Sequence, residues 1–257
     1  MKTNKLEIEH ISKKFSKLTK NIINSEKYIA FSLTHHSTAI EGSTLTEIQV
    51  YNLLEFGKTS NKPFLHHLMV SDFYTAFNFM ETAVKNKKTL SFQFIQQLGG
   101  LVVHGTGAII NTPVGTFDTT KGDLRLCSVR VADRYFPDYK KVPNLLKKLV
   151  EEIKADIEFA NTFSLKMEVA FKIHFLFVSI HPFADGNGRT ARLLMNYVQK
   201  LFNLPYTFIF KEDKAKYYSA LENARKKDDI TIFYNFMYSQ HLKFIKKEIA
   251  KIESSTK

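Results

Sequence analysis

The sequence predicts a mainly α-helical domain with one short β element, and three observations support this fold class. Apolar residues recur at spacings of three to five along most of the chain, which is the helical period. Only 6 proline and 10 glycine residues interrupt the 257 positions. Residues 164–180 are apolar on nearly every side, so we expect this segment to be the central helix of the fold.

The N-terminal third of the chain predicts several helices in succession. The first has an apolar stripe made of Leu6, Ile11, Phe15, Leu18 and Ile22. A second helix is expected over 29–40. Residues 44–47 (Thr-Leu-Thr-Glu) indicate a capping box that opens a third helix, which Gly57 closes. Residues 64–86 and 91–98 also have helical spacing.

The helical period is interrupted between Gly99 and Gly122. Pro113 and four further glycines lie in this interval, which predicts loops. The run 124–131 then alternates apolar and polar residues and predicts a short strand or hairpin arm.

Helical spacing resumes over 145–157 and leads to the central helix. A polar, glycine-rich turn follows that helix, and a further helix is expected to begin near Gly188. Two more, at 212–226 and 230–253, complete the predicted fold.

Composition restricts the class of protein. Lysine and arginine outnumber acidic residues by 37 to 25, and the excess is large in residues 1–27 and 243–257. We interpret these ends as solvated helix faces, with a surface for nucleic acid or another acidic partner as the alternative. The single cysteine, Cys127, excludes an internal disulfide and favours a cytoplasmic location. The chain starts without a secretory signal, and its most apolar stretch, 171–180, is too short to cross a bilayer, so no membrane association is expected.

The candidate chemistry lies in the segment 181–192, HPFADGNGRTAR. Its Gly-Asn-Gly turn (186–188) precedes a helix N-terminus, where backbone N–H groups and the helix dipole bind anions. Arg189 and Arg192 share a helical face and can hold phosphate oxygens.

Two further side chains of this segment complete a set of reactive groups. Asp185 offers a hard oxygen ligand for Mg²⁺, and His181 is placed to deprotonate a hydroxyl. Each feature alone has an ordinary structural explanation. Together, within twelve residues, they predict phosphoryl or nucleotidyl transfer.

The segment 181–192 also resembles, without a gap, the signature of the Fic family, His-x-Phe-x-(Asp/Glu)-Gly-Asn-Gly-Arg-x-x-Arg. Gly122-x-x-Arg125 followed by Val129-x-Val131 is similar to the flap hairpin of that family. The similarity extends over 37–240, most of the chain.

A third segment and two departures complete the resemblance. Tyr217-Tyr218-x-Ala220-Leu221 is similar to the family segment that helps enclose the adenine. Ala132 stands where many relatives have glycine, and Arg225 where some have a nucleotide-contacting asparagine.

The resemblance implies a Fic-type helical domain over 61–257, with a β-hairpin flap, preceded by an N-terminal helical extension over 1–60. It implies a protein adenylyltransferase that moves AMP from ATP to a hydroxyl side chain. His181 would be the general base, Asn187 would belong to the catalytic anion hole, and Asp185 would hold Mg²⁺. The implied nucleotide-binding residues are Asp185, Gly186, Asn187, Gly188, Arg189, Arg192, Val129, Arg130, Val131, Tyr217 and Tyr218.

The expected partners follow from this activity. They are ATP and a target protein whose Ser, Thr or Tyr acceptor pairs with the exposed strand of the flap. Homo-oligomer formation is compatible with the sequence. Nucleic acid is not the expected partner.

Residues 37–42 resemble the inhibitory motif of self-restraining Fic proteins, (Ser/Thr)-x-x-x-Glu-(Gly/Asn). Ser37 and Glu41 are four apart and share one face of a helix. The resemblance implies that Ser37, Glu41 and Gly42 form a brake in which Glu41 contacts Arg192 in place of the γ-phosphate. Such a glutamate can also position water for de-AMPylation, which we keep as a second activity.

Alternatives remain open at the sequence level. The same fold can transfer UMP, phosphate or phosphocholine, and the lysine-rich ends allow a non-catalytic nucleic-acid-binding protein. The protonation of His181 is also open. A helix C-terminus favours imidazolium, whereas the adjacent arginines and Mg²⁺ favour the neutral base.

Overall fold

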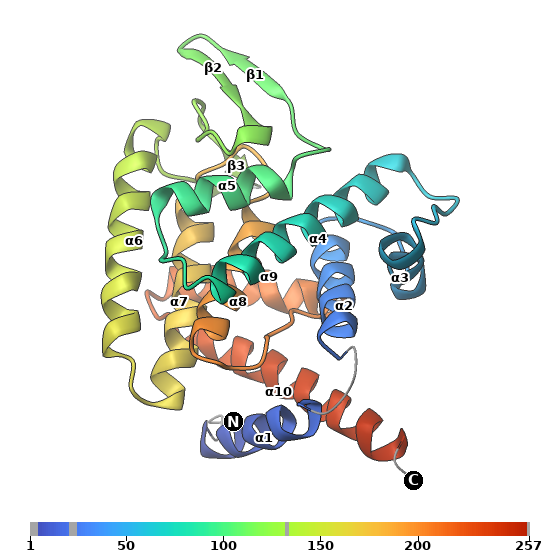
Figure 1. Ribbon diagram of the computed structural model, residues 1–257. Helices are drawn as coiled ribbons and strands as arrows, with labels where there is room; N and C mark the ends of the chain where they lie inside the picture. The colour runs from blue at the N-terminus through green and yellow to red at the C-terminus, as the bar shows by residue number, and fades with distance from the viewer. Residues whose placement is uncertain (1–4, 21–24, 132–133, 256–257) are drawn as a thin grey trace.

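The computed structural model describes residues 5–20, 25–131 and 134–255, and these are mainly helical (Figure 1). The predicted fold class is confirmed. The helices are α1 (Lys5–Thr19), α2 (Ser25–Ile40), α3 (Glu47–Phe56), α4 (Phe64–Lys85), α5 (Phe92–Val102), α6 (Val142–Phe159), α7 (Phe163–Ile180), α8 (Asn187–Leu201), α9 (Lys214–Lys226) and α10 (Thr231–Ser255). Ile22, assigned to the first helix, lies outside the described residues.

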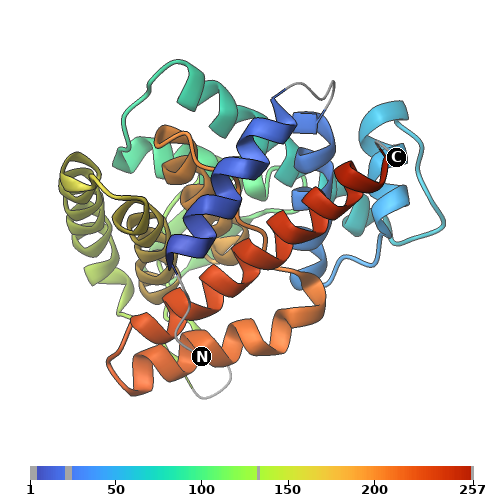
Figure 2. The same cartoon turned by 90° about the horizontal axis from the view of Figure 1, so that it is seen from below.

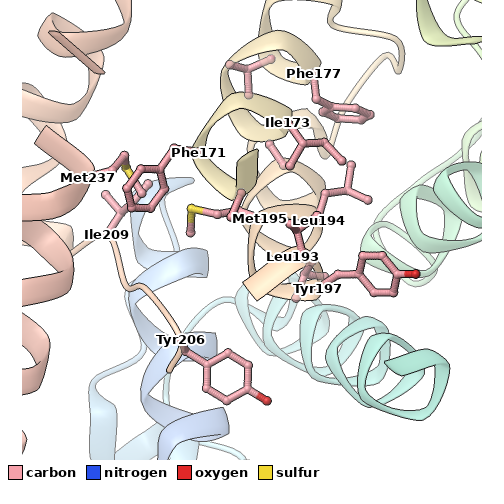
Figure 3. Close-up of a cluster of buried hydrophobic side chains, with 14 of the residues drawn as sticks. Phe171, Ile173, Phe177, Leu193, Leu194, Met195, Tyr197, Tyr206, Ile209 and Met237 are labelled. Carbon is pink, nitrogen blue, oxygen red and sulfur yellow. The ribbon is translucent and has the colours of Figure 1, made fainter. Parts of the chain in front are cut away.

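The centre of the fold is the antiparallel pair α7 and α8. As predicted, α7 is buried on most sides. It packs along α8, and on another side its Phe171 lies beside Met237 of α10 (Figure 3). Helix α8 is buried from Asn187 to Gln199, although it is rich in polar residues. Buried polar side chains need hydrogen-bond partners, so the sequence of α8 already suggests that neighbouring elements must satisfy it.

Helix α1 lies along α10 on the lower side of the molecule (Figure 2). Ser12 Oγ is 3.0 Å from His241 Nε2 in a buried contact. At the surface, Lys14 pairs with Glu253 at 2.7 Å and Lys246 with Glu7 at 3.4 Å. Lysines of each end are therefore partly neutralised by glutamates of the other end, which supports the interpretation as solvated helix faces.

The start of α3 corrects the predicted capping box. Thr46, not Thr44, is the N-cap: its hydroxyl accepts the N–H of Gln49, and the Gln49 side chain accepts the N–H of Thr46. The Thr44 hydroxyl instead lies 3.0 Å from His66 Nδ1. Gly57 closes the helix in a left-handed conformation, as expected.

The glycine-spaced region was predicted too simply. Helix α5 continues through Gly99 and Gly100. Both positions need glycine, because a Cβ at Gly99 would overlap the Phe183 ring and one at Gly100 would lie 2.7 Å from the Gly122 nitrogen. These glycines permit close packing and do not end the helix.

Two antiparallel hairpins occur in the described part of the chain, where one β element was predicted. The hairpin β1 (Ile109–Thr112) and β2 (Gly115–Asp118) was missed, and it projects from the top of the molecule (Figure 1). The predicted strand 124–131 is wrong over 124–129, because Arg125 donates its backbone N–H to Pro182 O at 3.1 Å. Only β3 (Arg130–Val131) is a strand there, paired with β4 (Arg134–Tyr135).

In the ranges that the structure describes, no helix is both long and apolar enough to span a membrane.

Candidate active site

His181 stands directly after α7 and is the C-cap of that helix. Its φ is 54° and its ψ 61°, the left-handed region that a residue with a side chain seldom adopts. The backbone N–H donates to Phe177 O at 2.9 Å, which completes the last helical turn. The imidazole stacks on Phe136, with ring centroids 4.0 Å apart. Strain and burial at one histidine are typical of a functional position.

The environment of His181 lowers the pKa of its imidazole to about 4. Burial is the largest cause, and the charges of Arg125, Arg134 and Arg225 act in the same direction, while the Val178 carbonyl opposes them. The question left open by the sequence is therefore decided in favour of the neutral imidazole. The responsible arginines are not those of the 181–192 segment.

Arg125 holds the loop that carries His181. Its fully buried side chain donates from Nε to His181 O at 2.8 Å, from Nη1 to Cys127 O at 2.7 Å and from Nη2 to Pro137 O at 2.6 Å. One guanidinium thus ties the loop that carries His181 to both ends of the β3–β4 segment. Sequence reasoning quoted Arg125 only as part of the flap pattern and missed this positioning role.

The Gly-Asn-Gly turn forms the N-terminus of α8. Gly186 is the N-cap with φ of 79°, and a Cβ there would lie 2.9 Å from Val103 Cγ1. The Asn187 side chain accepts the N–H of Phe183 at 3.0 Å and donates to Phe183 O at 2.9 Å. Asn187 therefore braces the turn, and the first backbone N–H groups of α8 lack helical acceptors. The turn forms a cradle for an anion.

Asp185 lies at the rim of this cradle with its side chain 72% exposed. Its Oδ1 accepts the N–H of Gly186 at 2.6 Å, and its Oδ2 accepts Arg189 Nη2 at 2.9 Å. Arg189 is buried and also donates to Val102 O at 3.0 Å. The arginine therefore orients the carboxylate and connects α8 to α5.

Arg192, one turn further along α8, is held by helix α2. Its Nε donates to Ser37 Oγ at 2.7 Å, and its Nη2 donates to Ser37 O at 2.9 Å and to Glu41 Oε1 at 2.7 Å. Burial lowers the pKa of Arg192, but the charge and hydrogen bond of Glu41 and the nearby Tyr217 and Tyr218 together raise it, and the net pKa is raised. Nη1 is buried without a hydrogen-bond partner among the described residues.

The end of α2 explains why the motif requires a residue such as glycine after Glu41. Ser43 N–H donates to Thr38 O and Gly42 N–H donates to Ala39 O, both at 3.1 Å, which is a Schellman motif. Gly42 supplies the required positive φ, 107°. Glu41 is consequently held at the helix terminus, opposite α8.

The carboxylate of Glu41 also lies over the anion cradle. A Cβ on Gly188 would be 2.5 Å from Glu41 Oε1 and 3.2 Å from Arg192 Nη1. Ser37 and Glu41 thus both contact Arg192, although α2 ends one residue before Glu41.

The two tyrosines of the adenine-like segment lie on α9 and differ in exposure. Tyr217 is buried, and its hydroxyl lies 3.2 Å from His174 Nε2 in the core. Tyr218 is 45% exposed. Of the two, only Tyr218 has a substantially exposed side chain.

The flap residues differ in position as well. Val129 precedes β3 and accepts the N–H of Phe136, and Val131 belongs to β3. Arg130 is exposed and stacks over Tyr135. Ala132 lies outside the described residues. Arg225, the other noted departure, donates from Nε to Ser179 Oγ at 3.2 Å.

Comparisons with known proteins find similar sequences and folds. Residues 89–199 match the model described as Fic/DOC family. The chain is 28% identical over 216 residues to "Protein adenylyltransferase Fic" of Drosophila persimilis, and 27% identical over 205 residues to "Protein adenylyltransferase fic-1" of Caenorhabditis elegans. These alignments cover 83% and 77% of this chain but 39% and 37% of the relatives, so the chain spans about two fifths of their length.

Solved structures extend the likeness to the whole fold. A Fic domain containing signaling protein from Bacteroides thetaiotaomicron superposes with a TM-score of 0.79 at 23% identity, over 96% of this chain and 98% of that one. A fragment of Fic-1 from C. elegans gives a TM-score of 0.77 at 25% identity, over 97% of this chain and 72% of that one. The family match over residues 89–199, the shared fold and the ungapped 181–192 signature make the chain similar to Fic/DOC proteins.

Proposed function

We propose that the chain is a protein adenylyltransferase that transfers AMP from ATP to a hydroxyl of a target protein, and that Glu41 restrains it. One observation carries the proposal: a carboxylate of the chain itself lies on Arg192 and over the N-terminus of α8. A group of anion-binding donors that is filled by an internal anion is what a restrained phosphate site requires. The names of the relatives supply the transferred group.

His181 acts as the general base. A base must be unprotonated when the acceptor hydroxyl arrives, and the low pKa of this imidazole keeps it neutral at pH 7. The hydroxyl oxygen attacks the α-phosphorus, its proton passes to the imidazole, and pyrophosphate leaves. Arg125 keeps the backbone of His181 in place during this step.

The phosphates bind at the N-terminus of α8, with Asn187 bracing the turn and Arg192 holding the γ-phosphate after Glu41 withdraws. Asp185 fits a Mg²⁺ ligand, because it is an exposed carboxylate that Arg189 orients toward the cradle. No cluster of three or more His, Cys, Asp or Glu is found among the described residues, so the remaining ligands would be phosphate oxygens and water. The ion, once bound, would offset phosphate charge.

The acceptor segment, a Ser, Thr or Tyr with its neighbours, pairs with the flap strand β3. Tyr218 and the flap residues 129–131 enclose the adenine of ATP. The same Glu41 can orient a water molecule for de-AMPylation. A cytoplasmic location, a division into 1–60 and 61–257, and homo-oligomer formation remain predictions from the sequence.

The test is mass spectrometry of the purified chain after incubation with Mg²⁺ and ATP. We expect AMP adducts on the chain itself, weak for the wild type and strong for Glu41→Gly, and absent from the double variant Glu41→Gly/His181→Ala. UTP and CTP in equal amounts serve as competitors. Adducts of another nucleotide would replace AMP in the proposal, and the absence of any adduct from Glu41→Gly, on itself and on added cell extract, would contradict it.

A further inference from the structure

Two arginines beside His181 have no role in the proposed mechanism so far. Arg134 lies on β4 and Arg225 on α9, and both are close enough to lower the pKa of the His181 imidazole. Neither forms an ion pair with a carboxylate of the described residues. The fully buried arginines near the turn all have acceptors: Arg189 pairs with Asp185, Arg192 pairs with Glu41, and Arg125 donates to three carbonyls.

Strand alternation directs Arg134 toward the catalytic histidine. In the β3–β4 hairpin, Arg130 is opposite Tyr135, and these two side chains meet on the outer face, where Arg130 Nη1 donates to the Tyr135 hydroxyl at 3.3 Å. Arg134 and Phe136 therefore share the other face. The Arg134 guanidinium lies 4.7 Å from the Phe136 ring centroid, and Phe136 in turn stacks on His181.

Arg134 also has an unsatisfied hydrogen-bond donor among the described residues. Its Nη1 is buried and has no hydrogen-bond partner in the part of the chain that the structure describes. The Arg134 side chain is half-buried, so its charge is partly removed from water, and this burial lowers the pKa of its guanidinium.

Arg225 approaches the histidine from the opposite element. Its Nε donates to Ser179 Oγ, two residues before His181, and its guanidinium lies 5.5 Å from the Phe175 ring. Burial and then the charge of Arg134 lower the pKa of Arg225 to about 10. The acidic residue that opposes this effect, Glu222, pairs with Lys226.

Two neighbouring, partly desolvated cations that lack a carboxylate partner among the described residues are unfavourable unless a ligand neutralises them. We propose that Arg134 and Arg225 form a second anion subsite, on the acceptor side of His181, that holds a carboxylate of the target protein beside its acceptor hydroxyl. The proposal rests on the adenylyltransferase function and names its substrate class: hydroxyl residues with Asp or Glu close by in the target.

The position of the pair favours the target over a nucleotide phosphate as the source of the anion. The phosphate donors, Arg192 and the α8 N-terminus, lie with Glu41, whereas Arg134 belongs to the flap hairpin that would hold the target. Main-chain pairing to a strand selects little by sequence, and a pair of guanidinium groups would add that selection.

A carboxylate in this subsite would also adjust the base. It would offset the two charges that lower the pKa of His181, and so move that pKa upward when an acidic target is bound. A general base works best when its pKa lies near the working pH. Correct targets would therefore be bound more tightly and deprotonated more readily.

The test uses the Glu41→Gly chain with labelled ATP and Mg²⁺ on degenerate peptides. Each peptide has a central Ser, Thr or Tyr, with Asp, Asn or Lys fixed at one flanking position at a time. At one or more positions we expect kcat/KM to be about tenfold higher for Asp than for Asn. The preference should fall below about threefold in Arg134→Gln and in Arg225→Gln, while the KM for ATP stays the same.

Controls separate this subsite from a structural role. Lys140→Gln, an exposed cation that follows the same hairpin, should keep the Asp preference. A merely structural arginine would lower the rates on Asp and Asn peptides equally and leave their ratio unchanged. A raised KM for ATP with an unchanged ratio would assign the pair to the nucleotide and overturn the proposal.

If the peptides are too short to bind, the sites at which the chain modifies itself test the same preference for a nearby carboxylate. We expect each modified hydroxyl to have Asp or Glu within two residues, and neutralising that residue to lower its modification about tenfold. Efficient transfer to hydroxyls in neutral surroundings would contradict the subsite and leave the adenylyltransferase function standing. No transfer at all would contradict the function itself.

Discussion

The two sides of the turn between α7 and α8 use arginine in opposite ways. On the phosphate side, Arg189 and Arg192 each contact a carboxylate of the chain, Asp185 and Glu41. On the proposed acceptor side, Arg134 and Arg225 have no carboxylate partner in the described ranges, and burial, together with these cations, lowers the pKa of His181 to about 4. Fully buried arginines thus contact internal carboxylates on one side, whereas the half-buried arginines on the other side contact none among the described residues.

This difference predicts that one side of the turn controls the rate of transfer and the other side controls the choice of target. Under the proposed function, the internal carboxylate would compete with phosphate and limit the rate until it withdraws. An uncompensated pair of cations favours an anion brought by the partner. Changes on the phosphate side should therefore alter turnover on every substrate, and changes on the acceptor side should alter which substrates are chosen.

The largest expected effect is the loss of the base. His181→Ala in the Glu41→Gly background should lower AMP transfer by about 10²–10⁴-fold, because general-base assistance has that size. ATP binding, measured by calorimetry on the same variant, should remain, since the phosphate donors lie on α8. Transfer at the rate of the parent would remove His181 from the mechanism.

Release of the brake comes next. Glu41→Gly should raise AMP incorporation roughly 10- to 100-fold, since a charged hydrogen bond contributes roughly 1.5–3 kcal/mol and about 1.4 kcal/mol is a factor of ten. The measurement is labelled AMP at saturating Mg·ATP. Arg192→Ala should not reproduce the gain, because it removes the γ-phosphate anchor together with the brake. Equal incorporation by wild type and Glu41→Gly would mean that the Glu41–Arg192 pair has no regulatory role.

The pH dependence tests the acceptor side. A histidine with a pKa near 6.5 would lose about 30-fold of its neutral form by pH 5. Because the pKa of His181 is lowered to about 4, the neutral base persists, and kcat/KM for the acceptor, which reports the chain before the target binds, should change less than about twofold between pH 8 and 5. The assay is single-turnover transfer by Glu41→Gly with nucleotide saturating. An acid limb centred near 6.5 would show that the arginines and burial do not act as described.

Asp185→Asn should weaken the apparent Mg²⁺ affinity about tenfold or more, since a charged ligand becomes neutral while its shape is kept. The readout is the Mg²⁺ concentration that gives half-maximal ATP binding and turnover. Arg189 is buried and loses part of its partner, so a melting curve must accompany the assay. An unchanged Mg²⁺ dependence would make Asp185 a structural residue of the loop.

The smallest effect concerns the geometry that holds the brake. Gly42→Ala meets no atom within 4 Å, but its φ of 107° is unfavourable for a side chain, so we expect about 1 kcal/mol of destabilisation. A looser helix end should also raise AMP incorporation a few-fold, less than Glu41→Gly does. Gly57→Ala, at the end of α3, is the matched control: it should cost similar stability without raising incorporation. A gain in both variants would attribute the effect to general loosening.

The sequence alone determined the parts of the protein whose geometry is local. The helical period of apolar residues located the helices. Residues 181–192 lie together because they are consecutive, so an anion cradle could be predicted from these twelve residues. Gly42 and Glu41 belong to this class too, since a helix end is decided within a few residues. The helical limits near Gly99 and the run 124–129 were wrong because packing against Phe183 and Pro182 decides them.

Tertiary structure alone decided the properties that depend on burial and on distant partners. It brought Phe136, Arg134 and Arg225 to His181, enclosed Tyr217, and placed Glu41 on Arg192, 151 positions away. The pKa of His181 illustrates the physical reason. Desolvation and charge act through space from every surrounding element, so no spacing along the chain can reveal them before the elements are packed.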